Sequence, residues 1–311
     1  MPPVLPPLPP GPLSLDAARD LGLADHQWRM PQLLRTTRSV RSTAPLTELP
    51  ERAAAFALAL PPDVAFSHVT AARLWGLPLP AHLEEQGDLD VIRDTGRGRI
   101  ERRGCISHRG LEHRVVASVQ GLRVTALADT WVDLGEVVRR GLGRDDLVVV
   151  GDVVATRLSD PQASGGPPRA LADALAARVR PRHASLLGDA LTLVRRGVRS
   201  PAETRARLMF HDAGFPEPEV NAPLHAAGGG WLAEGDLVWR AQRVVGEYQG
   251  AVHAGIRRRS EDSYRNGLLG DEGWTVLELF AQDLVPGARR VATLRRFARA
   301  LELDPARLRI H

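Results

Sequence analysis

The sequence predicts a mixed α+β protein built from two domains, and three observations lead to this prediction. Helix-like segments and short apolar, strand-like segments alternate along the chain. The length of 311 residues is sufficient for two hydrophobic cores of ordinary size. At 200–203, the letters Ser-Pro-Ala-Glu are typical of a new helix, because Ser is a preferred N-cap and Pro fits the first helical position. We therefore expect an α+β region up to residue 199 and an α/β domain over 200–311.

The composition indicates a soluble globular protein. No apolar run approaches the length of about 18 residues that suggests a transmembrane helix. All 41 basic residues are Arg, and the net charge of +4 is too small to indicate nucleic-acid binding by itself. Cys105 is the single cysteine, so no intrachain disulfide can form and a reducing, cytoplasmic compartment is expected. The Pro-rich segment 1–13 is expected to be a disordered tail.

A basic helical segment follows this tail. The pattern predicts a helix over about 14–21, a turn at Gly22 and a second helix over about 25–35, which together form a helix-turn-helix-like unit. Phosphates attract cations whatever the base sequence, so four arginines of this segment are candidate DNA contacts: Arg29, Arg35, Arg38 and Arg41. The alternative is a small helical hairpin with a solvated basic edge.

The rest of the front half predicts a small α+β region to residue 135 and a helical linker region over 136–199. Helices are expected at about 51–60, 67–75, 126–135, 145–157 and 169–179, and strands at about 88–93, 104–109, 114–119 and 121–125. The last two strands meet at Gln120-Gly121, which favours a hairpin. Cys105, His108 and His113 lack the paired spacing of a zinc motif, and a structural or incidental role is favoured.

The C-terminal domain predicts the order helix, strand, hairpin, helix, strand, helix. The helix that begins at Ser200 is expected to end at Gly214, and the Gly-rich turn 228–230 leads into the hairpin. The other elements are expected at about 219–224, 260–271, 274–279 and 288–301.

The hairpin carries the chemistry. The runs 236–240 and 243–248 flank a turn at Ala241-Gln242, and a symmetric closure sets Asp236 opposite Glu247, with Cβ atoms about 4.5–5.5 Å apart. Two carboxylates at this distance repel each other unless a cation lies between them, and Mg²⁺ prefers such oxygen ligands. The alternatives are two solvated strand-end acids, or a Glu247 that pairs with an arginine. Glu203 either closes the capping box of its helix or supplies a third acid.

Several ordered motifs in this domain carry a family resemblance: SPAETRARL, GFPEPEVN, GDLVW, VVGEYQGAVH, EDSYRNGLL and GWTVLEL. Over roughly 200–285 the chain resembles the domain of unknown function related to very-short-patch repair endonucleases. That group belongs to the PD-(D/E)xK nuclease superfamily, so the resemblance implies a restriction-endonuclease-like α/β fold with a central mixed sheet. It also implies a hypothetical Mg²⁺ or Mn²⁺ cofactor and DNA as partner.

The resemblance implies a role for each matching residue. Asp236 matches the first metal-binding Asp, Glu247 the acid of the (D/E)xK element, and Glu203 the acid supplied by the preceding helix. His253 matches a His that serves as general base or electrophilic partner in the repair-endonuclease branch, and Gln249 stands where the wider superfamily has Lys.

Further matching residues flank these five. Asp262 and Arg265 match a D-x-x-R element that closes the site. The basic loop Arg257, Arg258 and Arg259 supplies three more candidate DNA contacts. Gln249 can neither act as a cation nor take a proton. The resemblance therefore supports the nuclease fold more strongly than it supports catalytic activity.

The front half is similar to actinobacterial proteins with an AbiEi-type antitoxin, winged-helix N-terminal region. The motifs are SVRS, SHVTAARLWGLPLP and GLRVTALADTWVDLG. Three functions are therefore open: a metal-dependent endodeoxyribonuclease, a non-catalytic DNA-binding regulator of antitoxin type with a toxin as possible partner, and an interaction protein with neither activity.

Overall fold

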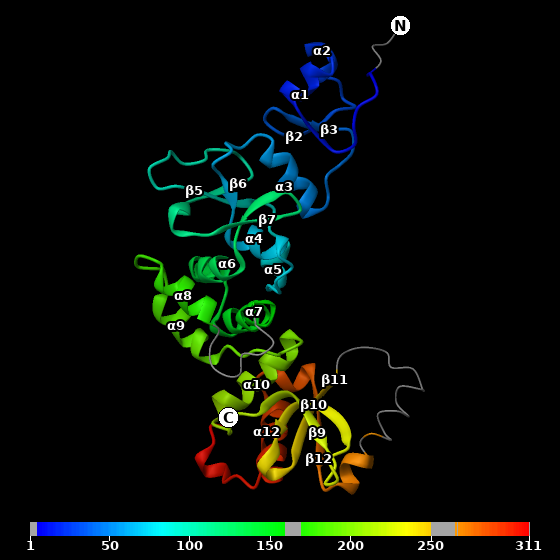
Figure 1. The fold of residues 1–311 in the computed structure, drawn as a ribbon, viewed down its shortest axis with the longest axis vertical. Coiled ribbons are helices and arrows are strands. Elements are labelled where there is room, and N and C mark those ends of the chain that lie inside the picture. The colour runs from blue at the N-terminus through cyan, green and yellow to red at the C-terminus, as the bar shows by residue number, and fades with distance from the viewer. Residues whose placement is uncertain (1–4, 159–168, 250–264, 266, 311) are drawn as a thin grey trace. The chain divides into compact units, whose positions relative to one another are not determined.

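The structure is a computed structural model, and it describes residues 5–158, 169–249, 265 and 267–310. The chain divides into two compact units (Figure 1). The front unit comprises the described residues of Met1–Val154 and Pro167–Leu193, and the C-terminal unit those of Ala155–Gly166 and Val194–His311. Both units combine helices with sheets, so the predicted mixed α+β class is confirmed.

The front unit begins with a small three-stranded sheet. Strands β1 (Pro12–Ser14), β3 (Val40–Ser42) and β2 (Leu34–Thr37) pair antiparallel in the order β1-β3-β2. Helices α1 (Leu15–Asp20) and α2 (Asp25–Trp28) complete this part. Leu5 and Leu8 pack against its core, so the prediction of a disordered tail over 1–13 is wrong for the described part of that segment.

The predicted second helix of the helix-turn-helix-like unit is also wrong in its length. It ends at Trp28 rather than near residue 35, and the chain enters β2 at Leu34. Pro31 accounts for the early end, because a proline disfavours helical geometry in the residue before it. The β-branched pair Thr36 and Thr37 then favours a strand.

The larger part of the front unit is built on a five-stranded mixed sheet of order β6-β5-β4-β8-β7. The strands are β4 (Ala65–Phe66), β5 (Leu89–Arg93), β6 (Cys105–Arg109), β7 (Val116–Val119) and β8 (Leu122–Thr125). The predicted β7–β8 hairpin is confirmed, with Gln120 and Gly121 both at positive φ in its turn. Helices α3 (Leu49–Ala57), α4 (His68–Leu74) and α5 (Ala81–Glu84) accompany the sheet.

Helices complete the front unit: α6 (Leu127–Asp133), the 3₁₀ helix η2 (Leu134–Arg140), α7 (Arg144–Arg157), α8 (Arg169–Ala176) and α9 (Ala184–Leu193). Helix α8 packs on α6, and α9 packs on α8 and η2. The predicted linker region over 136–199 is therefore not a separate part. Most of it packs into the front unit, and α9 is a helix that the pattern did not predict.

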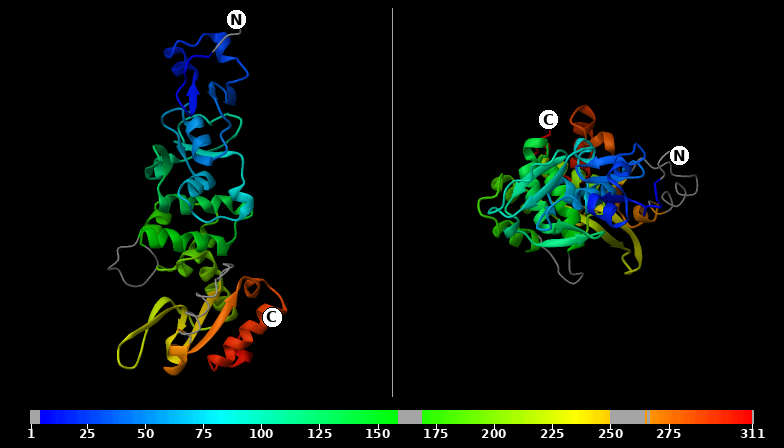
Figure 2. Two further views of the ribbon diagram at one scale, coloured as in Figure 1. Left: turned by 90° about the vertical axis from the view of Figure 1, so that its right-hand side faces the viewer. Right: turned by 90° about the horizontal axis from the view of Figure 1, so that it is seen from above.

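The C-terminal unit is a four-stranded mixed sheet with helices on both faces. Strands β9 (Glu219–His225), β10 (Trp231–Trp239) and β11 (Val244–Gln249) are antiparallel, and β12 (Thr275–Phe280) runs parallel to β11. Helix α10 (Pro201–Ala213) precedes the sheet and α12 (Ala288–Ala300) follows it. Figure 2 (left) shows α12 lying along the sheet.

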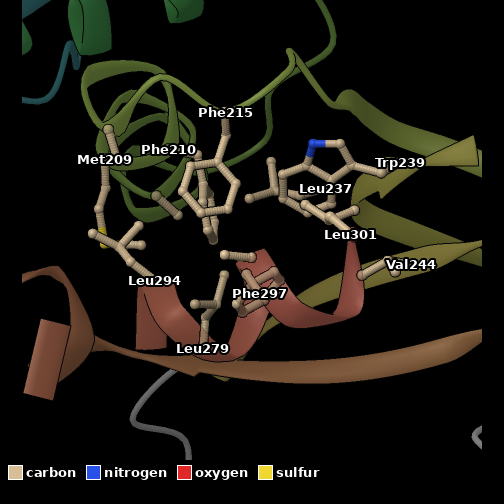
Figure 3. Packing of buried hydrophobic residues seen from close by; sticks show 13 residues of the cluster. Met209, Phe210, Phe215, Leu237, Trp239, Val244, Leu279, Leu294, Phe297 and Leu301 are labelled. Atoms are coloured by element: carbon tan, nitrogen blue, oxygen red, sulfur yellow. The ribbon is translucent and has the colours of Figure 1, made fainter. Parts of the chain in front are cut away.

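Aromatic side chains hold α10 and α12 on one face of this sheet (Figure 3). The ring of Phe210 lies 4.7 Å from that of Phe297 and 5.0 Å from that of Trp239, centroid to centroid. The opposite face has its own apolar cluster, in which Val238 and Val245 pack with Leu269 of the helical segment 267–271. Both faces of the sheet are therefore covered by helices, and each strand contributes side chains to both in alternation.

Candidate functional site

The β10–β11 hairpin has the predicted register. Leu237 pairs with Gly246, and Val238 with Val245. Continued by one residue beyond the paired positions, this register sets Asp236 opposite Glu247. The turn differs from the prediction: it is a 3₁₀ turn over Arg240–Gln242, followed by Arg243 at a φ of 53°.

The candidate side chains share the face of the sheet that is turned away from α10 and α12. Leu237, Val244 and Tyr248 belong to the α10/α12 core, so side-chain alternation places Asp236, Glu247 and Gln249 on the other face. The sequence segment that predicted the site therefore presents its two acids and Gln249 on one surface.

Asp236 lies where its negative charge is disfavoured. Burial raises the pKa of its carboxyl group above the usual range. The backbone N–H of Tyr248 donates to Asp236 Oδ2 over 2.7 Å and opposes this rise, whereas the charge of Glu203 adds to it. The positive charges of Arg265 and Arg199 act on the pKa of the same carboxyl group in the lowering direction. A cation beside Asp236 would thus relieve both burial and repulsion.

Glu203 serves the helix start and also lies near Asp236. Ser200 caps α10 by accepting from the Glu203 backbone N–H, and its hydroxyl donates to Glu203 Oε1 over 2.8 Å. Glu203 Oε2 accepts from the Arg199 backbone N–H over 3.0 Å and from Asn221 Nδ2 over 2.8 Å. Glu203 therefore does act in the capping of α10. Its negative charge also raises the pKa of Asp236, and this effect connects Glu203 to the candidate site.

Glu247 is 9% exposed, and Arg265 Nη2 lies 3.8 Å from its Oε2. Arg265 thus brings a positive charge to both hairpin acids, since it also acts on Asp236. This contact agrees with the alternative in which Glu247 pairs with an arginine, and equally with an arginine that closes an anionic site.

The acids lie near one another without forming a closed metal cage. Among the residues that the structure describes, one group of three has ligand atoms that all lie within 4.8 Å of one another, and it is His68, His108 and Glu136. Asp236, Glu203 and Glu247 form no such group in the described part of the chain. Their carboxylate oxygens are nonetheless the donor type that Mg²⁺ requires.

Two residues of this surface escaped prediction. Glu278 of β12 lies beside Glu247 in the parallel ladder, and Gln249 Nε2 donates to Glu278 Oε1 over 3.3 Å. Asn221 lies in β9, the strand that pairs with β10 on the side away from β11, at the level of Asp236. Its side-chain amide donates a hydrogen bond to Glu203. Both come from strands outside the hairpin, so no local sequence signal marked them.

Other predicted site residues, His253, Asp262, Arg257, Arg258 and Arg259, lie outside the described residues. The four N-terminal arginines are described. Arg29, Arg35 and Arg38 are exposed, and Arg35 and Arg38 line a cavity of about 640 Å³ in the front unit. Arg41 differs from them, because it donates to the Leu33 carbonyl over 2.9 Å and stacks on Trp28. Its role in the structure is to hold β3 on α2.

Two uncharacterized proteins of Mycobacterium tuberculosis are similar to part of this chain. They are MT2308 of strain CDC 1551 / Oshkosh and Rv2248 of strain ATCC 25618 / H37Rv, each 35% identical over 111 residues. The match covers 35% of this chain and 39% of each relative. No family model and no solved structure matches the chain. None of the helices in the described residues is long and apolar enough to cross a membrane.

Proposed function

We propose that the C-terminal unit is a metal-dependent nuclease domain that hydrolyses DNA phosphodiesters in the cytoplasm. The observation that carries this proposal is the β10–β11 register, which sets two acids opposite each other on one face of a mixed sheet. The charge of Glu203, at the start of α10, also acts on Asp236, so a third acid lies near this pair. Three carboxylates gathered around a half-buried position favour a divalent cation.

The acids of the site would bind the metal, and Arg265 would act on the substrate. Asp236 and Glu247 would hold Mg²⁺ or Mn²⁺ once their side chains turn toward a common point, with Glu203 or Glu278 as a third ligand. When bound, the metal supplies polarisation of a phosphoryl oxygen and of an attacking water. Arg265, which already acts on both hairpin acids, is suited to stabilise the negative charge that develops on the phosphoryl group.

DNA binding is proposed for the front unit. The exposed guanidinium groups of Arg29, Arg35 and Arg38 suit the phosphate backbone, which binds cations independently of base sequence. Arg103 and Arg102 line the same cavity as Arg35 and Arg38, and they extend this basic surface. Such binding weakens steeply as salt concentration increases.

The test is cleavage of supercoiled plasmid by the full-length protein. The wild type is expected to nick DNA with Mg²⁺ or Mn²⁺ and to be inactive with a chelator. Asp236→Asn and Glu247→Gln are expected to reduce the rate on the order of 100-fold or more, because each removes a charged group that acts in the transition state. Glu219→Gln is the matched control, since Glu219 lies on the same sheet but pairs with Arg240.

A non-catalytic DNA-binding regulator of antitoxin type is the second candidate, and two observations favour it. Gln249 donates to Glu278 and carries no charge, and both oxygens of Glu203 already accept hydrogen bonds within the fold. A toxin would be its possible partner. Salt-sensitive retardation of DNA in a gel, with no cleavage under any divalent metal, would establish this function instead of the first.

A further inference from the structure

Three metal-ligand side chains meet inside the front unit, far along the chain from the hairpin acids. His68 begins α4, His108 lies in β6, and Glu136 lies in η2. Each offers one ligand atom, and these three atoms all lie within 4.8 Å of one another. The elements that carry them are brought together by the fold alone.

One ring nitrogen of His108 contacts a carboxylate, as is usual for histidines that bind a metal through the other nitrogen. Its Nε2 lies 2.8 Å from Asp90 Oδ1, and Arg140 Nη1 donates to the same oxygen over 2.9 Å. The guanidinium of Arg140 forms an ion pair with the Asp90 carboxylate, so this carboxylate acts as the acceptor in its contact with His108. Nε2 of His108 therefore carries the hydrogen, and the lone pair is on Nδ1. A carboxylate behind the ring is the usual outer partner of a ligating histidine.

His68 supplies an observation that is independent of this geometry. Its side chain is fully buried, and its Nδ1 lies 2.8 Å from Ser67 Oγ. Its Nε2 is buried without any hydrogen-bond partner and lies 3.9 Å from Glu136 Oε2, too far for a hydrogen bond. A buried polar atom without a partner costs about 1–3 kcal/mol. The backbone of His68 is also held at a φ of 49°, a strained geometry of the kind that clusters at functional sites.

Glu136 connects the buried rings to solvent. Its side chain is 32% exposed and lines a cavity of about 270 Å³. Five arginines line that cavity as well: Arg109, Arg114, Arg178, Arg180 and Arg182. Arg182 Nε lies 3.7 Å from Glu136 Oε2, but its side chain is 63% exposed and can swing away. The cavity thus reaches Glu136, and it leaves room for an anion or water as fourth ligand.

We propose that the front unit binds one divalent transition metal ion through His68 Nε2, His108 Nδ1 and a Glu136 oxygen. Two imidazoles and one carboxylate suit Zn²⁺ and its neighbours rather than Mg²⁺. The two rings lie stacked with centroids 3.6 Å apart. Because each lone pair lies in the plane of its ring, coordination requires one ring to tilt out of the stack. This site is separate from the proposed nuclease site and does not depend on it.

The test is calorimetric titration of metal-free, full-length protein with Zn²⁺, with Co²⁺ absorption as a report on ligand type. The wild type is expected to bind one Zn²⁺ per chain at this site and to give the visible bands of a nitrogen-containing Co²⁺ site. His68→Gln and Glu136→Gln are expected to weaken binding on the order of 100-fold or more, since loss of an outer partner alone costs about 10–100-fold. Glu136→Gln is the safer variant for folding, because Glu136 is partly exposed.

A matched control keeps this result specific. His225→Gln removes an exposed histidine of β9 and is expected to bind Zn²⁺ like the wild type. Equal binding by the wild type and Glu136→Gln, or no binding by the wild type, would overturn the proposal. Circular dichroism of each variant identifies a loss of binding that arises from unfolding, in which case the Glu136→Gln comparison decides.

Discussion

At the scale of single residues, the proposed metal ligand Asp236 carries a charge that the fold disfavours. Burial and the charge of Glu203 raise the pKa of its carboxyl group, so the folded state favours the protonated form. Its contribution to stability is therefore present at acidic pH and is lost as pH rises through the raised pKa. A bound divalent cation reverses this effect, because it favours the ionised carboxylate.

Asp236→Asn is expected to be at least as stable as the wild type at neutral pH in the presence of a chelator, since it removes a disfavoured charge. Mg²⁺ at ten times its dissociation constant is expected to stabilise the wild type by about 1.4 kcal/mol and to leave the variant unchanged. Thermal unfolding with and without Mg²⁺ measures both effects. A variant that is much less stable in chelator and still gains from Mg²⁺ would contradict this view of Asp236.

Asp283 has the opposite electrostatic balance. Burial alone would raise the pKa of its carboxyl group, but hydrogen bonds from Arg289, the Phe280 backbone and Thr293 lower it overall. The ionised form therefore stabilises the folded state at a pH above the pKa of Asp283 in the unfolded chain, and this contribution is lost as pH falls through the lower folded pKa.

Asp283→Asn is expected to lower the free energy of unfolding by about 1–3 kcal/mol at neutral pH, because hydrogen bonds to a charged acceptor are replaced by weaker ones. The difference from the wild type should shrink below about pH 4. Denaturant unfolding over a pH series measures it, with the exposed Asp271→Asn as the control. A difference that stays constant with pH would show that the charge of Asp283 is not responsible.

The sequence was informative about residues whose partners are local. Asp236 and Glu247 could be paired from one turn and two short runs, and the observed register agrees. Asn221 and Glu278 could not be found, because they reach the site from other strands. His68 and His108 had no metal-motif spacing, and only the packing of α4 and β6 stacks their rings.

At the scale of elements, the β10–β11 hairpin depends on glycine where its strands pack closely. A Cβ at Gly235 would lie 2.7 Å from a methyl of Val245 and 2.8 Å from one of Val238, and both Val side chains are stiff. Position 235, next to Asp236, must therefore be glycine if the strands are to keep this register and this close packing.

Gly235→Ala is expected to destabilise the C-terminal unit by about 1–3 kcal/mol through overpacking, and to reduce any nuclease activity because Asp236 shifts with its strand. Gly228→Ala is the matched control, since a Cβ at Gly228 in the β9–β10 turn meets no atom within 4 Å. Chemical denaturation of both variants is the measurement. Equal stability of Gly235→Ala and Gly228→Ala would show that the strands tolerate a wider separation.

Elements with strong local signals were predicted well, and those that depend on packing were not. Helix α10 begins after Ser200 and ends at Gly214 as expected. The capping hydroxyl of Ser200 and the left-handed backbone of Gly214 both act on residues that are close in the sequence. The predicted helix over 25–35 stops at Trp28, because Pro31 and the strand pairing of β2 with β3 outweigh its helical pattern. The two-residue strand β4 is too short to leave a periodic pattern.

At the scale of the whole molecule, the chain divides near the boundary that the sequence indicated. The second and longer segment of the C-terminal unit begins at Val194, a few residues before the predicted start at Ser200. The two proposed sites lie in different units, with His68, His108 and Glu136 in the front unit and the hairpin acids in the C-terminal unit.

Two unfolding transitions are therefore expected in calorimetry, and each should respond to a different metal. Zn²⁺ is expected to raise the temperature of one transition and Mg²⁺ that of the other, since a ligand stabilises the unit that binds it. Glu136→Gln should abolish the Zn²⁺ response alone, and Asp236→Asn the Mg²⁺ response alone. A single transition that both metals shift together would mean that the units unfold as one.

Plasmid nicking by the full-length protein decides whether Asp236 and Glu247 form the proposed metal-dependent site that cleaves phosphodiesters. Nicked circles are expected with Mg²⁺ or Mn²⁺ and none with chelator. Asp236→Asn and Glu247→Gln are expected to lose activity on the order of 100-fold or more, and Glu219→Gln to cleave like the wild type. Cleavage that persists at the wild-type rate in Asp236→Asn, or no cleavage by the wild type with any divalent metal, would show that these two acids do not form such a site.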